Sequence, residues 1–346
     1  FNNRRSVKIV FWGTPQYAVP TFHSLLEKGH QIVGVVTQPD KRRSRGKKIT
    51  YSPIKKAALE HNLPIFTPEK IKNDLEIQNQ IFKLKADIFI VVAFGQILPK
   101  SVLEHPPFGC WNIHASILPR WRGAAPIQYS LINGDKYTGV AIMHMEEGLD
   151  TGPILIQEKL EINQRDNFQM LSNRLSQLSA KLILEAVDLI ELKGIISPSE
   201  RIKILNMKTQ NQLIGEVKYA GLIKKEDLLI EWNSGSLNIH RRVMGLYPNA
   251  YTYWHGKRLK VLSTFYSIKD YCDDSYTDKI YNLIEQNQFK IPGTIVDTSN
   301  KYGIIVLTSD MPIIILQCQL EGKRPVEKSN MINQIKAFAG QGFNTI

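Results

Sequence analysis

Cysteine is scarce in this chain, which has three cysteines among its 346 residues. Cys110, Cys272 and Cys318 lie far apart and show no Cys-x-x-Cys spacing. Structural zinc sites need clustered ligands, and disulfide frameworks need cysteines in pairs. The sequence therefore predicts no metal site and no disulfide framework, and it favours a reducing compartment.

Long hydrophobic runs are also missing. No apolar stretch approaches the ~20 residues that a membrane-spanning helix needs, and residues 1–6 are too short and too polar for a signal peptide. The hydrophobic content of 43% is typical of a globular protein with a buried core. We therefore expect no membrane association, and we expect the protein in the cytosol or in an organelle matrix.

A glycine-rich dinucleotide fingerprint is absent from the first strand and turn. Residues 7–12 are apolar except for Lys8 and predict a buried strand, which Gly13-Thr14-Pro15 follows. Pro15 lacks the N–H that a pyrophosphate-binding turn would use, so a dehydrogenase is disfavoured. Instead, Thr14 is expected to cap a helix that begins at Pro15 and ends before Gly29.

Acidic residues are outnumbered, since 44 Lys and Arg face 32 Asp and Glu for a formal net charge of +12. Such an excess favours a polyanionic partner, because Lys and Arg neutralise phosphates. The densest basic run surrounds Gly46, although charge runs are most often solvated loops without a partner. Its members are Lys41, Arg42, Arg43, Arg45, Lys47 and Lys48.

The first part of the chain alternates predicted strands with predicted helices, which is the pattern of an α/β fold with a doubly wound, Rossmann-like parallel sheet. A long amphipathic helix over residues 168–192 is expected to close this domain. The other strands are predicted at 32–37, 87–94, 138–145 and 154–162, and a short strand that carries Asn112 and His114 is expected after the second of these. The other helices are predicted near 53–61 and 71–84.

A second domain is expected after a segment that is rich in polar residues and turns. We predict a first domain over residues 1–194, a linker over 195–212 and a second domain over 213–346. Many short apolar segments separated by turn residues indicate a small β-barrel in the second domain. Residues 266–291 form an acidic connection between two of these segments.

The segment from Cys110 to Pro126 holds the strongest candidate for a site. Asn112 and His114 are two residues apart in a predicted strand, so their side chains point the same way. Arg120 and Arg122 follow closely and suit an anionic substrate. An amide donor beside an imidazole fits carbonyl chemistry, although an isolated Asn-x-His is more often a strand end with an incidental histidine.

The longer motif decides between these interpretations, because the chain resembles the formyltetrahydrofolate-dependent formyltransferases, most closely the members that act on an aminoacyl-tRNA. The matching blocks follow the family's order from residue 7 to about residue 160. They are Phe11-Trp12-Gly13-Thr14-Pro15, Thr37-Gln38-Pro39-Asp40, Gly46-Lys47-Lys48, residues 92–99, Asn112-Ile113-His114, residues 116–126 and Gly148-Leu149-Asp150-Thr151-Gly152.

The resemblance implies a reaction and a set of site residues. Asn112, His114 and Asp150 match the family's catalytic residues, and 10-formyltetrahydrofolate is the implied formyl donor. The implied acceptor is the α-amino group of methionyl initiator tRNA, with the basic run as a loop that enters the acceptor end. An OB-like barrel is implied for the second domain. The implied folate-binding residues are Phe94, Gly95, Gln96, Ile97, Leu98, Ser116, Ile117, Leu118 and Pro119.

The chemistry of these residues fits that reaction. Asn112 offers a neutral N–H to a developing oxyanion, and His114 can donate to the same oxygen or move a proton. Asp150 can orient His114 or accept the proton of the amine, and these roles are not separable from sequence. Without the resemblance, Asp150-Thr151-Gly152 would be interpreted as an ordinary turn.

Two other functions remain open at this point. The Asn-x-His and Asp motifs also occur in formyltransferases that act on small amines such as glycinamide ribonucleotide or an amino sugar. A noncatalytic RNA-binding protein on the same fold is the second alternative. The basic run and the second domain argue against the first alternative, and the presence of Asn112, His114 and Asp150 together argues against the second.

Overall fold

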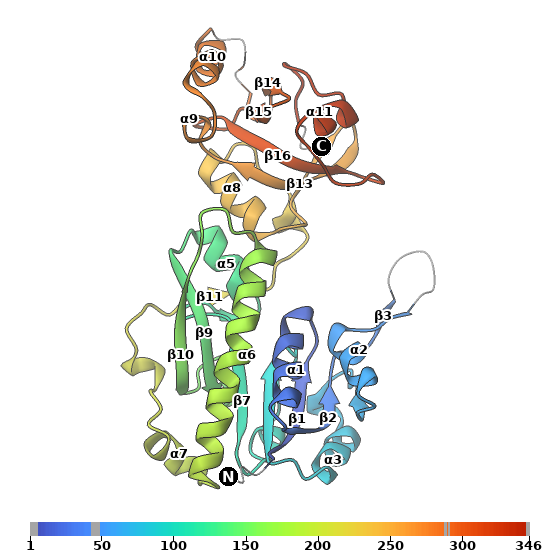
Figure 1. Ribbon diagram of the computed structural model, residues 1–346, viewed down its shortest axis with the longest axis vertical. Coiled ribbons are helices and arrows are strands. Elements are labelled where there is room, and N and C mark those ends of the chain that lie inside the picture. The colour runs from blue at the N-terminus through green and yellow to red at the C-terminus, as the bar shows by residue number, and fades with distance from the viewer. Residues whose placement is uncertain (1–5, 43–48, 287–288, 290, 344–346) are drawn as a thin grey trace. The chain divides into compact units, whose positions relative to one another are not determined.

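The structure, a computed structural model, describes residues 6–42, 49–286, 289 and 291–343. Backbone contacts divide the chain into two compact units (Figure 1). The first unit comprises the chain up to Pro126 together with Tyr137–Glu161 and Ser172–Gly221, and the second comprises Ile127–Lys136, Ile162–Leu171 and the chain from Leu222 onward.

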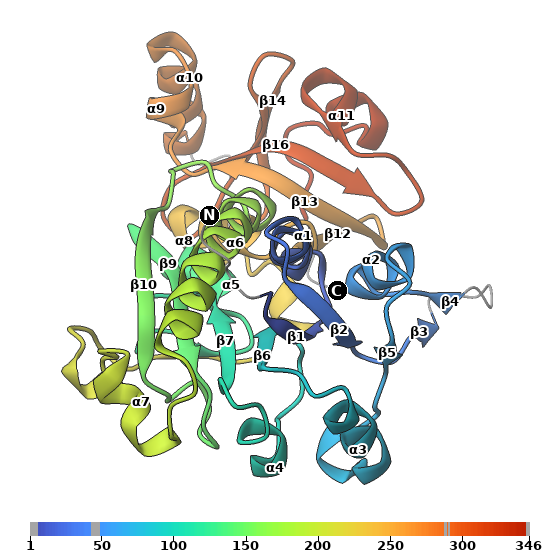
Figure 2. The same ribbon diagram turned by 60° about the horizontal axis from the view of Figure 1, so that its bottom comes forward.

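The first unit is built on a mixed sheet, which in the described part of the chain has seven strands in the order β10-β9-β7-β6-β1-β2-β5. Figure 2 lets the reader follow this order across the sheet. The strands from β5 to β7 run parallel, and β9 and β10 add an antiparallel hairpin at one edge. The strands are β1 (Lys8–Gly13), β2 (Gln31–Val36), β5 (Ile65–Phe66), β6 (Ile88–Val92), β7 (Cys110–His114), β9 (Tyr137–His144) and β10 (Ile154–Glu161).

Alternate residues of the central strands point to opposite faces of this sheet. Helices cover both faces. On one face, Phe11 of β1 packs edge-on against Phe22 of α1, with ring centroids 5.5 Å apart. On the other, Trp12 packs against Phe89 and Phe94 in a buried cluster with residues of α3 and α4. The predicted doubly wound α/β fold is confirmed. The helices of this unit are α1 (Val19–Glu27), α2 (Pro53–Glu60), α3 (Leu75–Lys83), α4 (Lys100–Leu103), most of α6 (Phe168–Lys193) and α7 (Pro198–Ile204).

The first helix begins later than the sequence predicts. A short 3-10 turn (Gln16–Ala18) comes first, and α1 follows from Val19. Thr14 does not cap this helix, because its hydroxyl donates to the carbonyl oxygen of Phe94 at 3.2 Å and accepts the N–H of Gln38. Thr14 therefore ties the end of β1 to the loop after β6, a long-range role that outweighs local capping.

The segment 195–212, predicted as a linker, carries its own structure. It contains α7, and Arg201 of that helix is buried and donates to Nε2 of His144 at 2.9 Å. A 3-10 turn, Gln210–Gln212, follows. The segment is thus attached to the first unit, and the domain boundary remains a prediction.

The second unit contains an antiparallel sheet of six strands among the described residues, with five in the order β12-β13-β16-β15-β14 and β17 paired to β16. This sheet confirms the predicted small β-domain. Its strands are β12 (Tyr251–Trp254), β13 (Lys257–Phe265), β14 (Ile295–Ser299), β15 (Gly303–Val306), β16 (Ile313–Leu320) and β17 (Val326–Glu327). The helices that fall mainly in this unit are α5 (Pro126–Asn133), α8 (Ser236–Gly245), α9 (Ile268–Tyr271), α10 (Asp274–Glu285) and α11 (Lys328–Ile335).

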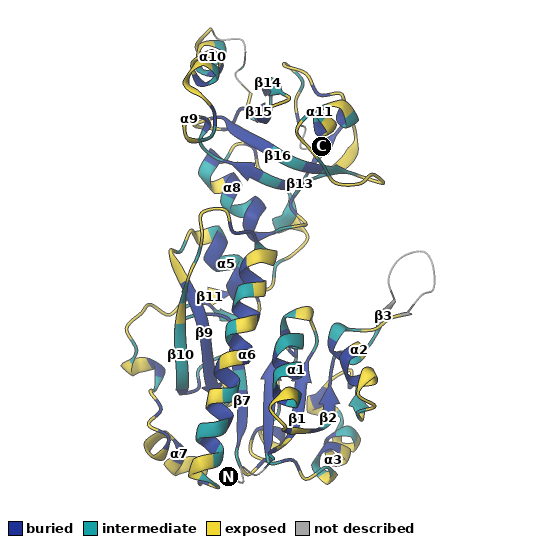
Figure 3. Ribbon diagram, viewed as in Figure 1, coloured by how far each residue is buried: buried dark blue, intermediate teal, exposed yellow. Residues whose placement is uncertain are grey.

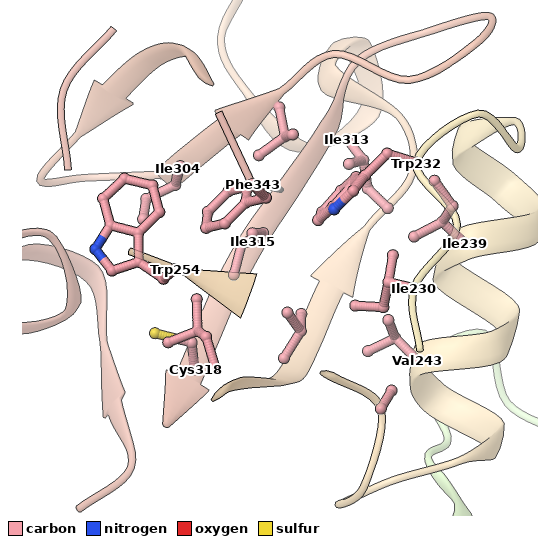
Figure 4. Close-up of a cluster of buried hydrophobic side chains, with 14 of the residues drawn as sticks. Ile230, Trp232, Ile239, Val243, Trp254, Ile304, Ile313, Ile315, Cys318 and Phe343 are labelled. Carbon is pink, nitrogen blue, oxygen red and sulfur yellow. The ribbon is translucent and has the colours of Figure 1, made fainter. Parts of the chain in front are cut away.

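The core of the second unit forms around two tryptophans, which Figure 4 shows among apolar side chains from the sheet and from α8. Phe343 lies between them, with ring centroids 5.4 Å from Trp232 and 5.0 Å from Trp254. Each indole N–H has an acceptor, the hydroxyl of Thr252 for Trp232 and the carbonyl of Ile335 for Trp254. The large aromatic area is therefore buried without an unpaired donor.

Within the acidic segment 266–291, two described helices pack onto the second sheet. Its helices α9 and α10 bury Ile268 and Ile280 in a cluster with residues of β14, β15 and β16. Asp273 caps α10 by accepting the N–H of Tyr276. Asp273 also pairs with Lys301 at the surface, at 3.1 Å.

In the part of the chain that the structure describes, no helix combines the length and the apolar character that crossing a membrane would require.

A buried histidine of α8 should make stability depend on pH. His240 is 5% exposed, its Nδ1 lies 3.0 Å from the hydroxyl of Thr264, and burial lowers its pKa to about 4, with a smaller contribution from Arg241. An unfolded histidine titrates near ~6.5 and so binds more protons than the folded one between these values. The resulting stabilisation is complete above pH ~6.5 and is lost as the pH falls toward 4.

Replacing His240 with Gln should remove this dependence. Between pH 7 and 4.5, the wild-type protein should lose roughly 2–3 kcal/mol more unfolding free energy than the variant does. Chemical unfolding at the two pH values measures the difference, and His255→Gln at an exposed position is the control. An identical pH dependence in wild type and His240→Gln would contradict the expectation.

Candidate active site

The predicted site residues lie near the point where the strand order of the sheet reverses. Strand β1 has β2 on one side and β6 on the other, so the connections after β1 and β6 diverge. Asn112 of β7 pairs with Val91 of β6, which pairs with Trp12 near the end of β1. Ligands of doubly wound sheets bind at the carboxyl end of such a switch point. The end of β7, with His114, is therefore well placed for a site.

The structure brings the three predicted catalytic side chains together. Asn112 Nδ2 lies 3.4 Å from Asp150 Oδ1, and His114 Nδ1 lies 3.6 Å from Asp150 Oδ2. The side chains of His114 and Asp150 are 6% and 13% exposed. Asp150 comes from the connection between β9 and β10, which starts beside Trp111 and folds back over β7. This return path brings residues that are far apart in sequence into one cluster.

A backbone contact determines which nitrogen of His114 bears the proton. Nε2 lies 2.8 Å from the carbonyl oxygen of Trp121. Because a carbonyl only accepts, Nε2 carries the hydrogen of the neutral ring, and the lone pair on Nδ1 faces the carboxylate of Asp150. His114 Nδ1 and Asp150 Oδ2 thus lie 3.6 Å apart. This pair suits a group that brings a proton to the site.

Asp150 is held in an uncommon backbone conformation. Its φ is +51°, a left-handed value that non-glycine residues adopt rarely. Its Oδ2 accepts the N–H of Gly123 at 2.7 Å. Gly123 belongs to the short strand β8 (Arg122–Gly123), which pairs with β11 (Tyr219–Ala220). A Cβ at Gly123 would lie 2.6 Å from the carbonyl oxygen of Ala220, so this position requires glycine.

The predicted folate segment Ser116, Ile117, Leu118 and Pro119 forms the turn after β7. The Ser116 hydroxyl is buried and donates to the carbonyl oxygen of Arg120 at 2.6 Å. Leu118 packs in a small core with Met143 and Ile154, and the Leu118–Pro119 peptide is cis. Side chains of this segment therefore hold the turn, and Ile117 is its half-buried apolar member.

The second predicted folate segment, Phe94 to Leu98, divides in two. Phe94 and Leu98 belong to the buried core, whereas Ile97 is 76% exposed. Gly95 has a φ of +86°, and the Gln96 amide is engaged by the loop before α3, where its Oε1 accepts the N–H of Ile71 at 2.8 Å. The loop thus presents Ile97 and backbone groups at its surface, and Gln96 stabilises its shape.

The basic run lies mostly outside the described residues. Lys41 and Arg42 form the backbone of a short strand, β3, which pairs antiparallel with β4 (Ile49–Thr50). Arg43, Arg45, Lys47 and Lys48 fall between these two strands and lie outside the part of the chain that the structure describes. Their role in binding RNA remains a prediction.

The contacts of three residues around Asp150 did not follow from the sequence. Gly123 supports its carboxylate, and the side chain of Gln210 donates to its backbone carbonyl at 2.7 Å. Arg122 was assigned to an anionic substrate, yet its guanidinium donates to Gln210. The glycine after Arg122 was a visible signal. Gln210 gave none, because it lies in the predicted linker far along the chain from Asp150.

Comparison with known families supplies the class of protein. Residues 7–187 match the family described as formyl transferase, and residues 222–336 match the formyl transferase C-terminal domain. The chain therefore belongs to the formyl transferase family.

The curated relatives indicate a particular enzyme of this family. A methionyl-tRNA formyltransferase from Synechococcus sp. (strain CC9902) is 50% identical, over 98% of this chain and 100% of the relative. One from Prochlorococcus marinus (strain MIT 9313) is 47% identical, over 96% of this chain and 98% of the relative. Among solved structures, HypX from Aquifex aeolicus in complex with tetrahydrofolic acid is 12% identical, with a TM-score of 0.61 over 96% of this chain and 48% of that protein, and this likeness shows the fold alone.

Proposed function

We propose that this protein transfers a formyl group from 10-formyltetrahydrofolate to the α-amino group of methionyl initiator tRNA, in the first step toward translation initiation with N-formylmethionine. Relatives with about half of their residues identical, matched over nearly their whole length, carry the name methionyl-tRNA formyltransferase. The observation that supports the chemistry is the cluster of Asn112, His114 and Asp150, in which the Asp150 carboxylate lies 3.4 Å from the Asn112 amide and 3.6 Å from the His114 ring.

The residues around the cluster fit a flat folate ring system. Ile97 exposes an apolar side chain on the loop that Gly95 bends, and flat heterocycles bind where apolar surface and backbone groups meet. We assign the loop 94–98 and the turn 116–119 to folate binding on this basis. When bound, the folate supplies an activated formyl carbon, and the protein's task is to orient it and stabilise charge.

Asn112 is the proposed donor to the formyl oxygen. Its Nδ2 carries two hydrogens, and the long contact to Asp150 engages one of them, so the other is available to a ligand. Attack by the amine puts negative charge on the formyl oxygen. A neutral N–H that is already positioned stabilises this charge in the transition state more than in the ground state.

His114 and Asp150 are the proposed proton acceptor. The amine must lose a proton as its nitrogen bonds to the formyl carbon, and Nδ1 of His114 has a lone pair on the side of Asp150. The carboxylate 3.6 Å away stabilises the imidazolium that results. The same proton is then available to the departing nitrogen when the bond from the formyl carbon to that nitrogen breaks. The pair acts as base first and as acid second.

The second unit has a surface suited to RNA. On β12 and β13, Thr252, Trp254 and Leu259 point into the core, so the alternate residues share the outer face. Tyr251 pairs with Lys260 and Tyr253 pairs with Arg258 across the two strands, and the Arg258 guanidinium lies 4.3 Å from the Tyr251 ring centroid. Aromatic rings beside cations stack on bases and neutralise phosphates. This face supports a nucleic-acid acceptor over a small amine.

The function is tested by the choice of acceptor. Purified protein with 10-formyltetrahydrofolate should formylate charged initiator methionyl-tRNA faster than charged elongator methionyl-tRNA, and glycinamide ribonucleotide should not react. Formylation of the small amine at an equal rate would support the first alternative. Absence of transfer to every acceptor would support the noncatalytic alternative.

Changes in the cluster should lower turnover more than tRNA binding. Asn112→Ala should reduce kcat by about 10²–10³-fold, the usual effect of removing one oxyanion donor, while the tRNA KM changes little. Asp150→Asn should lower kcat because the neutral amide no longer stabilises the charged imidazole. Steady-state kinetics measure both, and Asn73→Ala at an exposed position is the control. Wild-type kcat in either variant would remove that residue from the catalytic set.

Changes in the basic run should have the opposite effect. Replacing Arg42, Arg43 and Arg45 with Ala should raise the tRNA KM with little change in kcat, and should flatten the log–log salt slope of tRNA binding by about 2 to 3. A variant of the same net charge, with the exposed Lys72, Lys83 and Lys85 changed to Ala, should keep the wild-type slope. Equal slopes in the two triple variants would show that this run does not contact phosphate.

A further inference from the structure

The buried amide of Gln210 uses its full hydrogen-bonding capacity. Gln210 is 5% exposed, and its Nε2 donates to the carbonyl oxygen of Asp150 at 2.7 Å and to that of Gly152 at 3.0 Å. Its Oε1 accepts from Nε and Nη2 of Arg122 at 3.0 and 2.7 Å. A side-chain amide has two hydrogens and two acceptor sites, and here all four are matched. The orientation of Gln210 is therefore determined.

These contacts close a ring around Asp150. Gln210 holds the backbone carbonyl of Asp150, Arg122 holds Gln210, and the next residue, Gly123, donates its N–H to the Asp150 carboxylate at 2.7 Å. Gln210 thus holds the backbone of Asp150 and Gly123 holds its side chain, and Arg122 connects these two residues. Neither contact alone would fix the direction of the carboxylate toward His114.

The conformation of Asp150 explains why such support is needed. A left-handed φ of +51° at a residue other than glycine persists only where surrounding contacts determine it. Without the two hydrogens of Gln210, the carbonyls of Asp150 and Gly152 would lose buried donors, and the turn would relax. The carboxylate would then move relative to Nδ1 of His114, and small displacements of this kind strongly reduce turnover.

We infer that Gln210 is a positioning residue for formyl transfer, which acts through Asp150 and is itself oriented by Arg122. This inference rests on the proposed function, since it assigns a role at the same site. The site then includes a residue of segment 195–212, which was predicted as a linker. The guanidinium of Arg122 has the role of orienting the Gln210 amide.

The sharpest variant is Gln210→Glu. Glutamate has nearly the same shape and keeps the acceptors for Arg122, but an oxygen then faces the carbonyls of Asp150 and Gly152 in place of the donor. We expect kcat to fall by about 10²-fold, in line with displacement of a reacting group by an ångström, and the tRNA KM to stay within about twofold of wild type. Arg122→Lys keeps the charge but loses the two-pronged contact, so it should lower kcat in the same way.

The matched control is Gln212→Glu. Gln212 lies in the same 3-10 turn, is exposed, and accepts the N–H of Thr209 instead of contacting Asp150. It should keep the wild-type kcat. Unfolding midpoints of all variants are compared in parallel, and if Gln210→Glu does not fold, Arg122→Lys takes its place in every comparison.

A double-mutant comparison separates positioning from general structural support. Single-turnover rates are measured for Gln210→Glu in the wild-type and Asp150→Asn backgrounds, with charged initiator methionyl-tRNA as acceptor. If Gln210 acts through Asp150, its change should have little further effect once Asp150 is Asn. An equal fold-loss in both backgrounds, or an unchanged kcat in the single variant, would overturn the inference. Absence of transfer by the wild-type protein would instead refute the proposed function.

Discussion

The hydrogen bond from the Gly123 N–H to the Asp150 carboxylate joins the parts of the site that chain connectivity keeps apart. Gly123 follows the turn after β7, and Asp150 belongs to the connection between β9 and β10. At the same position β8 lies so close to β11 that Gly123 has no room for a side chain. A backbone constraint thus determines where the only carboxylate of the proposed cluster points.

The sheet beneath this bond supplies the rigidity that it needs. Strands β6 and β7 lie between other strands and are almost entirely buried, as Figure 3 shows for β7. Their hydrophobic side chains stabilise a fixed backbone, and the side chains of Asn112 and His114 leave that backbone in parallel directions. The cluster therefore combines one fixed element, β7, with one folded-back connection. Catalytic precision then depends on how well the connection is held.

Sequence patterns predicted the fixed element better than the connection. The two-residue spacing placed Asn112 and His114 on one face of a predicted strand, and the structure places that strand beside β6. Asp150 was found through family resemblance, because a turn with glycine on either side gives no local sign of a long-range partner. Thr14 matched a capping pattern, yet its hydroxyl donates to the carbonyl oxygen of Phe94 in the loop after β6. Gln210 was missed because it lies in a polar segment, and nothing in its local sequence indicates that its side chain is buried and hydrogen-bonded to Asp150 and Arg122.

The electrostatic arrangement explains why the support is neutral. The Asp150 carboxylate contacts a backbone N–H and an amide donor. The guanidinium of Arg122 donates instead to Gln210, whose amide donates to the backbone carbonyl of Asp150. A cation in direct contact would stabilise the carboxylate by itself and weaken its attraction for a protonated His114. Neutral donors orient the charge without cancelling it. In the proposed proton transfer, the carboxylate therefore stays available to the imidazolium of His114.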